Sequence, residues 1–282
     1  MSDSPPPNDP GAAKMKLVHI SDIHFSPNPI LGIDPVANFR ACLDHVIEFH
    51  ADADRIVITG DLTHHGLMES YIRLKAMLDE SPLKDGRAPR LLVGNHDDRL
   101  AFRSVFPDAA ADESGYVQWA EDVAAGRFIY LDTAEKGTHA GRYGDGRLAW
   151  LRRQLEKAAR DGVGAWIFMH HNPTAVHVAN ADCIGIVEEA QFLALLAEFR
   201  ATVRHIFFGH CHFTLSGAVH GIPFSAPRST CHTCWPDFSG IAERMGCGDL
   251  VPNYNVCILS GHSTVVHSID FLDQHKVRWL SG

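Results

Sequence analysis

The amino-acid sequence predicts an α/β fold with four layers, in which two mixed β-sheets pack together and helices flank them (αββα). Up to residue 208, apolar strand segments alternate with amphipathic helical segments, which indicates largely parallel sheets with right-handed crossovers. After residue 208, short strands follow one another without helices, which indicates antiparallel additions. The chain has 282 residues, 45% of them hydrophobic, which suits one large domain with a substantial core.

The expected strands are short and apolar or β-branched, whereas the expected helices repeat apolar residues at a spacing of three and four. Strands are predicted at Lys16–Ile20, Arg55–Thr59, Pro89–Val93, Val117–Val123, Arg127–Asp132, Ala165–His170 and Val203–Phe208, and near 213–220, 255–260, 262–270 and 276–280. Helices are predicted over 37–50, Leu67–Leu78, Arg147–Arg160 and Val187–Phe199.

The chain divides into a short tail and one domain. Residues 1–14 are rich in Pro, Asp, Asn and Ser and predict a disordered tail, and residues 15–282 predict a single domain. No apolar stretch is long enough to span a bilayer or to form the core of a signal peptide, so we expect a cytoplasmic protein without membrane contact. Residues 226–254, irregular and rich in Pro, Gly and Cys, predict a loop over a site.

The charge balance limits the kind of partner. The formal net charge is −9, and no cluster of Lys and Arg is dense enough to attract a polyanion. Long nucleic acids are therefore not expected as partners, because their non-specific affinity comes from basic charge. A small anionic substrate remains compatible with the sequence, since bound metal cations reverse the local field.

The seven cysteines are odd in number and scattered along the chain. Cys231 and Cys234 form a C-x-x-C motif, a spacing found in zinc sites and redox pairs. No second C-x-x-C follows, and the motif does not open a βα unit of thioredoxin type. We therefore interpret these residues as reduced thiols in a loop.

Polar side chains with metal-binding chemistry follow five of the predicted strands directly. Ligands in open α/β sheets bind at the carboxyl ends of the strands, so these residues are expected to meet at one edge of the fold. Taken singly, each motif has an ordinary structural interpretation, such as a turn or a buried histidine. All five motifs in this order are hard to explain in that way. The residues concerned are Asp22, His24, Asp61, Asn95, His96, His170, His210 and His212.

The donor types and their spacing favour a pair of transition-metal ions. The two side chains of Asp22-x-His24, and those of His210-x-His212, point the same way on extended backbone. Carboxylate, amide and imidazole donors together suit Mn, Fe, Zn or Co better than Ca or Mg. Seven donors supply four protein ligands to each of two ions if one carboxylate bridges them. Such a pair can activate a hydroxide for attack on a phosphate ester.

The same motifs resemble those of the calcineurin-like metallophosphoesterases. The order DIH, GDL, GNHD, HH-x-P and GH-x-H carries this resemblance. A narrower similarity is to the bacterial branch that contains class III cyclic-nucleotide phosphodiesterases and glycerophosphodiesterases. It rests on the segments HISDIHF (19–25), GDLTHHG (60–66), GNHDD (94–98), HHNP (170–173) and STCH (229–232). The resemblance runs from about residue 16 to the 230s. One departure is His64, where this branch often has Asp, and it concerns substrate preference rather than metal binding.

The resemblance implies a role for each matching residue. One ion would be held by Asp22, His24 and His212, the other by Asn95, His170 and His210, and Asp61 would bridge them. His96 would act as general acid or stabilise the transition state, and with Asn95 it would contact the substrate. Asp97 is interpreted either as the partner that orients His96 or as a helix N-cap. His64 is interpreted as a substrate-binding residue on a loop at the edge of the site. His171 and His177 are interpreted either as pocket residues or as exposed loop histidines.

The sequence therefore predicts a metal-dependent phosphodiesterase. Its substrates would be small phosphodiesters, cyclic nucleotides of the 3′,5′-cAMP type first, attacked by a metal-bridging hydroxide. The alternatives are a glycerophosphodiesterase, a 2′,3′-cyclic nucleotide phosphodiesterase or a phosphomonoesterase on the same scaffold. The acidic net charge argues against a nuclease. The complete set of metal ligands argues against an interaction module that binds metal but has lost catalysis. The resemblance also allows a homodimer.

Overall fold

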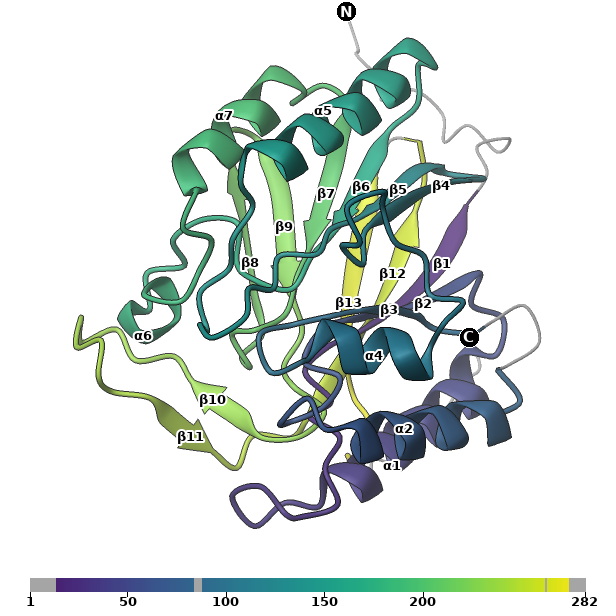
Figure 1. Ribbon diagram of the computed structural model, residues 1–282, viewed down its shortest axis with the longest axis vertical. Helices are drawn as coiled ribbons and strands as arrows, with labels where there is room; N and C mark the ends of the chain where they lie inside the picture. The colour runs from purple at the N-terminus through teal and green to yellow at the C-terminus, as the bar shows by residue number, and fades with distance from the viewer. Residues whose placement is uncertain (1–13, 84–87, 262, 274–282) are drawn as a thin grey trace, which may run out of the picture.

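Two mixed β-sheets form the centre of the molecule in a computed structural model that describes residues 14–83, 88–261 and 263–273 (Figure 1). The first sheet has the strand order β13-β12-β1-β2-β3 and the second β4-β5-β6-β7-β9-β8. The strands of the first sheet are β1 (Met15–Ile20), β2 (Arg55–Thr59), β3 (Arg90–Leu92), β12 (Asn253–Leu259) and β13 (Thr264–Asp270). Those of the second are β4 (Trp119–Val123), β5 (Gly126–Tyr130), β6 (Ala165–Phe168), β7 (Val203–Phe207), β8 (Leu215–Val219) and β9 (Ile222–Ala226).

Strand direction follows the order of elements along the chain. The strands β1, β2 and β3 are parallel, as are β5, β6, β7 and β9, because helical crossovers connect most of them. Strand β12 runs antiparallel to β1, and β13 runs antiparallel to β12 at the sheet edge; β8 is likewise antiparallel to β9, and β4 to β5. The mixed sheets predicted from the sequence are thus confirmed.

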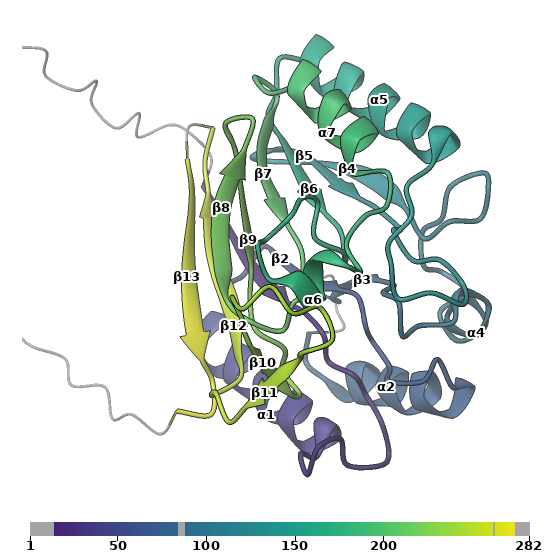
Figure 2. The same cartoon turned by 90° about the vertical axis from the view of Figure 1, so that its left-hand side faces the viewer.

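Helices cover the outer face of each sheet, which completes the four layers (Figure 2). The helices α1 (Pro35–His50) and α2 (Met68–Glu80) lie against the first sheet, and α5 (Asp145–Arg160) and α7 (Glu189–Glu198) lie against the second. Shorter helices are α4 (Arg99–Val105) and α6 (Ala179–Asp182). Asp34 caps α1 by accepting from the backbone N–H groups of Val36 and Ala37, so the helix begins where the sequence changes from turn to apolar repeat.

Aromatic side chains fill the space between the two sheets. Phe128, Tyr130, Trp166, Phe168 and Phe207 are fully buried there, together with Leu17 and Val57 of the first sheet. The rings of Phe168 and Phe207 stack with centroids 5.0 Å apart. Because this layer is closely packed, the strand ends on both sheets are held in fixed positions relative to one another.

The structure departs from the sequence-based elements mainly after residue 226. The segment 226–254 was expected to be irregular, but it contains a hairpin of β10 (Thr233–Trp235) and β11 (Gly246–Gly248). The strand β9 and the short helices α4 and α6 were not anticipated. The strand expected at 276–280 and the tail expected over 1–14, apart from Lys14, fall outside the described residues. None of the helices in the described ranges is long and apolar enough to cross a membrane.

Candidate metal centre

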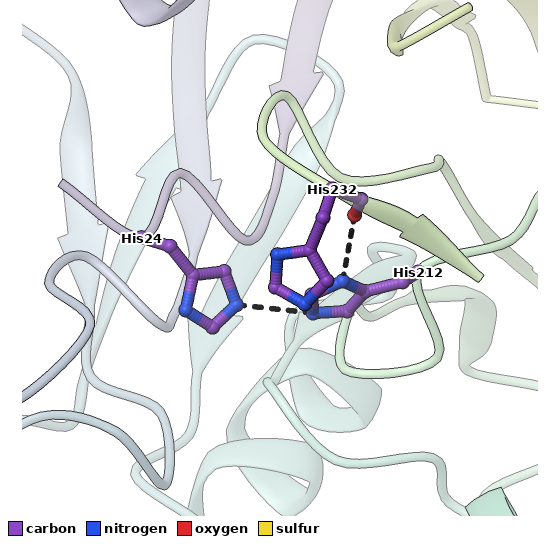
Figure 3. A group of neighbouring side chains, drawn as sticks. All are labelled: His24, His212 and His232. Atoms are coloured by element: carbon purple, nitrogen blue, oxygen red, sulfur yellow. Dashed lines mark hydrogen bonds between the residues drawn. The ribbon is translucent and has the colours of Figure 1, made fainter. Parts of the chain in front are cut away.

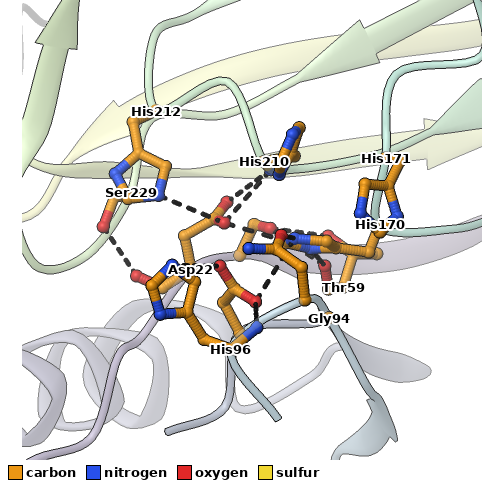
Figure 4. Close-up of polar contacts among 12 residues, drawn as sticks. Asp22, Thr59, Gly94, His96, His170, His171, His210, His212 and Ser229 are labelled. Carbon is orange, nitrogen blue, oxygen red and sulfur yellow. Dashed lines mark hydrogen bonds and ion pairs between the residues drawn. The ribbon is translucent and has the colours of Figure 1, made fainter. Parts of the chain in front are cut away.

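The five predicted motifs meet at the carboxyl ends of strands from both sheets (Figure 4). Asp22 lies two residues after β1, Asp61 two after β2 and Asn95 three after β3, all in the first sheet. His170 lies two residues after β6 and His210 three after β7, in the second sheet. The site therefore lies where the two sheets present their strand ends to each other.

An unusual backbone conformation brings these side chains together. Asp22, His24, Asp61, His210 and His212 all have positive φ, between 43° and 66°, a region that L-residues other than Gly rarely occupy. Each such residue costs of order 1–3 kcal/mol, and such residues concentrate at functional sites. The shared strain at five candidate ligands indicates that their backbone is shaped for binding.

The carboxylate of Asp61 stands between two groups of donors. Its Oδ2 atom lies 3.5 Å from Nε2 of His24, and its Oδ1 atom lies 3.4 Å from Nε2 of His170. The backbone N–H of His96 donates to Oδ1 at 2.9 Å and fixes the carboxylate in this orientation. Each oxygen therefore faces a different histidine, from a different sheet.

Backbone carbonyls set the orientation of two site histidines. Nδ1 of His170 donates to the carbonyl of Thr59 at 2.8 Å, and Nδ1 of His212 donates to the carbonyl of His232 at 2.9 Å. Since a carbonyl can only accept, each ring carries a proton on Nδ1 and turns Nε2 inward. This arrangement is common for histidines that bind metals.

Distances between the inward-facing atoms fit metal coordination. Two nitrogens that each lie about 2.1 Å from one ion are about 3.0 to 3.4 Å apart. Nε2 of His24 and Nε2 of His212 are 3.0 Å apart (Figure 3), and Oδ1 of Asn95 lies 2.9 Å from Nε2 of His170. The buried Nε2 of His210 has no hydrogen-bond partner within the protein. The donor set thus fits metal ions by chemistry and by spacing.

Electrostatics at the site also favours added positive charge. Burial alone would raise the pKa of Asp22 and Asp61, but neighbouring histidines, chiefly His212 and His170 respectively, hold both below their ordinary range. Burial opposes charge on His170, but Asp61 and Asp22 outweigh it and raise its pKa to about 9. His210 responds in the opposite way, because burial lowers its pKa to about 3. The two carboxylates therefore favour positive charge at the site, whereas burial keeps the imidazole of His210 neutral.

Gly94 is required by the close approach of three loops. A Cβ atom at this position would overlap Oδ1 and the backbone nitrogen of Asp61 and would lie 2.8 Å from Cε1 of His170. Any side chain here would displace the carboxylate that faces both donor groups. The glycine that precedes Asn95 thus has a steric role in forming the site.

Asp97 has a role that differs from both interpretations drawn from the sequence. It is half-buried and accepts from the backbone N–H groups of Leu62, Thr63 and Gly94, so it ties the β2 loop to the β3 loop. Its carboxylate bonds these backbone groups and not the His96 side chain. It also does not cap α4, because the N-cap residue is Asp98. Both interpretations were therefore wrong.

His96 is oriented by another residue. Its Nδ1 donates to the carbonyl of His64 at 2.8 Å, and its Nε2 lies 4.0 Å from Oδ2 of Asp61. The rings of His96 and His64 are stacked, with centroids 5.2 Å apart, and Nδ1 of His64 lies 3.2 Å from Nδ1 of His24. Both His64 and His96 line the cavity above the site, as a substrate contact requires.

His171 and His177 do not line this cavity. His171 is fully buried behind His170, with Nδ1 at 2.7 Å from Oγ1 of Thr133 and Nε2 at 3.1 Å from the carbonyl of His139. Both ring nitrogens already have protein partners and the buried ring does not line the cavity, so neither the predicted substrate contact nor the exposed position of His171 agrees with the structure. His177 is exposed on a loop, which agrees with the second interpretation of that residue.

Two further histidines face the cavity, and sequence reasoning did not place them there. Nδ1 of His139 lies 2.9 Å from Nδ2 of Asn95. The ring of His232 lies 4.3 Å from that of His212 and 4.9 Å from that of His24, centroid to centroid. His232 belongs to the STCH motif that carried part of the resemblance, whereas His139 belongs to a loop without any recognisable signal.

The cavity has a volume of about 510 Å³ and extends from the metal-facing residues to the β10–β11 hairpin.

All seven cysteines are free thiols, in agreement with the sequence interpretation. Cys231 and Cys234 are buried, and Cys234 lies opposite Cys247 in the hairpin, so the C-x-x-C pair does not form a site of its own. The segment 226–254 therefore borders the cavity, as predicted, but part of it forms the β10–β11 hairpin.

Comparison with solved structures supports the fold. A dimetal phosphatase from Danio rerio superposes with a TM-score of 0.68 and 13% sequence identity, covering 92% of this chain and 97% of that chain. At this identity the likeness concerns the fold alone.

Sequence comparison supports the family. The profile of the calcineurin-like phosphoesterases matches residues 15–213. A probable cyclic nucleotide phosphodiesterase of Rhodopseudomonas palustris is 30% identical over 92% of this chain and 93% of its own. A glycerophosphodiester phosphodiesterase of Enterobacter lignolyticus is 31% identical over 74% of this chain and 80% of its own. The chain therefore belongs to the calcineurin-like phosphoesterase family.

Proposed function

We propose that this protein is a dinuclear-metal phosphodiesterase that hydrolyses small phosphodiesters, with 3′,5′-cyclic nucleotides as the leading substrates. The family and the relative from Rhodopseudomonas palustris, which matches over nine-tenths of both chains, support diester hydrolysis. The observation that carries the dinuclear centre is the position of Asp61, whose two oxygens face histidines of different sheets.

Seven residues form the proposed ligand set. His24 and His212, with Nε2 atoms 3.0 Å apart, would bind one ion together with Asp22, whose Oδ1 lies 3.4 Å from Nε2 of His212. Asn95, His170 and His210 would bind the other, and Asp61 would contact both. Their donors suit Mn, Fe, Zn and Co. When bound, two such ions activate a water molecule and neutralise charge on the phosphoryl oxygens.

The residues around the ions position the substrate and handle a proton. His96 carries its proton on Nδ1, so Nε2, which faces the cavity, is free to accept a second proton and pass it to the leaving oxygen. Asn95 and His64 also line the cavity and would contact the phosphate or its ester arms. A protonated His96 would also stabilise charge that develops on the phosphoryl group.

The test is a metal-reconstitution assay. Protein stripped with a chelator is reconstituted with Mn, Fe, Co or Zn and assayed with bis-p-nitrophenyl phosphate. We expect at least one metal to restore hydrolysis, and no activity with any of them would contradict the proposal. A panel of 3′,5′- and 2′,3′-cyclic nucleotides, glycerophosphodiesters and monoesters then ranks the substrates. A higher kcat/KM for monoesters would identify a phosphomonoesterase instead.

Cytoplasmic location and a homodimer stay predictions from the sequence. Cell fractionation and size-exclusion chromatography test them.

A further inference from the structure

The cavity also has a wall of residues that the proposed reaction does not use. This wall combines residues of the β1 loop, the α6 region, the β7 loop and the β10–β11 hairpin. It is lined mainly by apolar side chains: Ile30, Leu31, Val178, Ala181, Phe213, Trp235 and Met245. We propose that it binds a flat aromatic ring carried by one ester arm of the substrate, and that Trp235 determines this specificity. This inference rests on the proposed phosphodiesterase function.

Trp235 is the largest apolar side chain of the wall and is 60% exposed. It pairs with Gly246 across the hairpin, where a Cβ atom would lie 3.0 Å from Cβ of Trp235. Since Gly246 has no side chain, the neighbouring strand adds nothing that could cover the indole. An exposed tryptophan on a cavity wall offers a rigid planar surface, which aromatic rings bind by stacking.

The wall offers little positive charge to a second anionic group. Apart from histidines, Asp61 and Arg244 are the only lining residues within the described part of the chain with ionisable side chains of full charge. Nε of Arg244 lies 3.2 Å from Oδ2 of Asp237, so this guanidinium already has an acidic partner. An arm bearing further phosphates would have to compete with Asp237 for Arg244 while losing hydration. The wall therefore suits an uncharged ring.

Hydrogen bonds hold the wall at a fixed place relative to the candidate metal centre. The backbone N–H of Cys234, next to Trp235, donates to the carbonyl of His212 at 2.9 Å. Nδ2 of Asn180, in α6, donates to the carbonyl of Ala242 in the hairpin turn at 2.9 Å. A ring bound at Trp235 would thus keep the phosphate of the same molecule near His212. Binding energy gained at the wall would position the reacting group.

A planar ring fits this wall better than a flexible acyl chain of a lysophospholipid. An acyl chain would lose much conformational freedom on binding and would gain little from one rigid face. The indole of Trp235 and the imidazoles of His64 and His232, which also line the cavity, provide planar surfaces for a heteroaromatic ring. Stacking of one nucleobase on an aromatic side chain contributes about 1–3 kcal/mol in nucleic-acid-binding proteins.

The experiment compares Trp235→Ala with Trp235→Phe and with Phe238→Ala. Phe238 is a matched control, because it is 74% exposed in the same hairpin and does not line the cavity. Metal-loaded proteins are assayed with 3′,5′-cAMP and with glycerophosphoglycerol, whose ester arms have neither a ring nor a cation that could bind an indole. We expect Trp235→Ala to raise KM for cAMP about tenfold, the effect of one lost stacking contact. It should leave kcat/KM for glycerophosphoglycerol within about twofold of the unmodified protein's value, and Trp235→Phe should restore most of the affinity for cAMP.

Three outcomes would overturn the inference. If Trp235→Ala lowers kcat/KM equally for both substrates, Trp235 has a structural role. An unchanged KM for cAMP would exclude stacking. Faster hydrolysis of lysophosphatidylcholine than of cAMP by the unmodified protein would assign the wall to an acyl chain.

A binding measurement separates this inference from the proposed function. If the unmodified protein hydrolyses no diester, the proposed function fails, and equilibrium binding of AMP to the metal-loaded protein still tests the wall. We expect AMP to bind about tenfold more weakly to Trp235→Ala than to the Phe238→Ala control. Equal affinities would reject the role of Trp235.

Discussion

At the scale of single residues, the candidate metal centre depends on a few atoms whose positions are fixed by neighbours. Asp61 receives the backbone N–H of His96, which turns one carboxylate oxygen toward His170 and the other toward His24. His96 is itself held by the carbonyl of His64. The ligand residues therefore act as a connected set, in which the loss of one member disturbs the others.

Substitution of His96 should remove proton transfer and leave the fold intact. We expect His96→Ala to lower kcat for bis-p-nitrophenyl phosphate by about 10²- to 10⁴-fold, the usual contribution of a positioned general acid. Its ring is 26% exposed, so the free energy of unfolding should change little. His267→Ala, an exposed histidine in β13, is the control and should keep full activity. A wild-type rate in His96→Ala would reject the assigned role.

Two glycine substitutions should have opposite effects on stability. Gly94→Ala places a Cβ atom against Asp61, so we expect loss of metal and a free energy of unfolding lower by about 2 kcal/mol or more. Gly146→Ala meets nothing within 4 Å in helix α5 and should raise the free energy of unfolding by up to about 1 kcal/mol. Urea denaturation and metal analysis of both variants test this contrast. Equal stabilities would contradict the steric role of Gly94.

At the scale of elements, the strands that deliver ligands could be predicted, and the β10–β11 hairpin could not. β2 is a run of β-branched residues between polar segments, so its position follows from the sequence. β10 and β11 have three residues each and contain Cys, Gly and Trp without any alternation of polarity. Their position is fixed by tertiary contacts such as the hydrogen bond from the backbone N–H of Cys234 to the carbonyl of His212. Such contacts leave no periodic signal in the sequence.

Strand β7 carries a pH-sensitive histidine away from the metal centre. His205 is buried and bonded through Nε2 to Oγ of Ser225 at 2.8 Å, and burial lowers its pKa to about 4 from an unfolded value near 6.5. Between these values the unfolded chain binds more protons than the native one, so stability is present above pH 6.5 and is lost as pH falls toward 4.

The substitution His205→Gln should remove this pH dependence. From pH 6.5 to 5, the wild-type protein should lose about 2 kcal/mol more of its free energy of unfolding than the variant. Urea denaturation of both proteins at the two pH values gives the difference directly. Parallel losses in the two proteins would show that His205 does not titrate on unfolding.

At the scale of the whole molecule, the candidate metal centre joins the two sheets. Asp22 and His24 follow a strand of the first sheet, whereas His170, His210 and His212 follow strands of the second. The four-layer architecture could be predicted because strands and helices alternate so regularly. Strand order could not, because the pairing of β12 with β1 joins residues that are more than 200 positions apart.

Removal of metal should therefore loosen the contact between the sheets. Ligands that bind only the native state add about 4 kcal/mol at a concentration 1,000 times Kd. For a chain of this size, we expect Tm to fall by roughly 10 °C after chelation and to recover when metal is restored. His267→Ala should show the same shift, and Asp61→Asn a smaller one. Identical Tm values with and without metal would contradict this role.

In the proposed mechanism, two metal ions, shared through Asp61, form the catalytic centre. Metal-free protein is titrated with Mn or Co while bound metal and hydrolysis of bis-p-nitrophenyl phosphate are measured in the same samples. We predict that activity reaches its plateau at two equivalents of metal per chain, and that Asp61→Asn retains less than two equivalents and little activity. A plateau at one equivalent, or activity in metal-free protein, would contradict the claim.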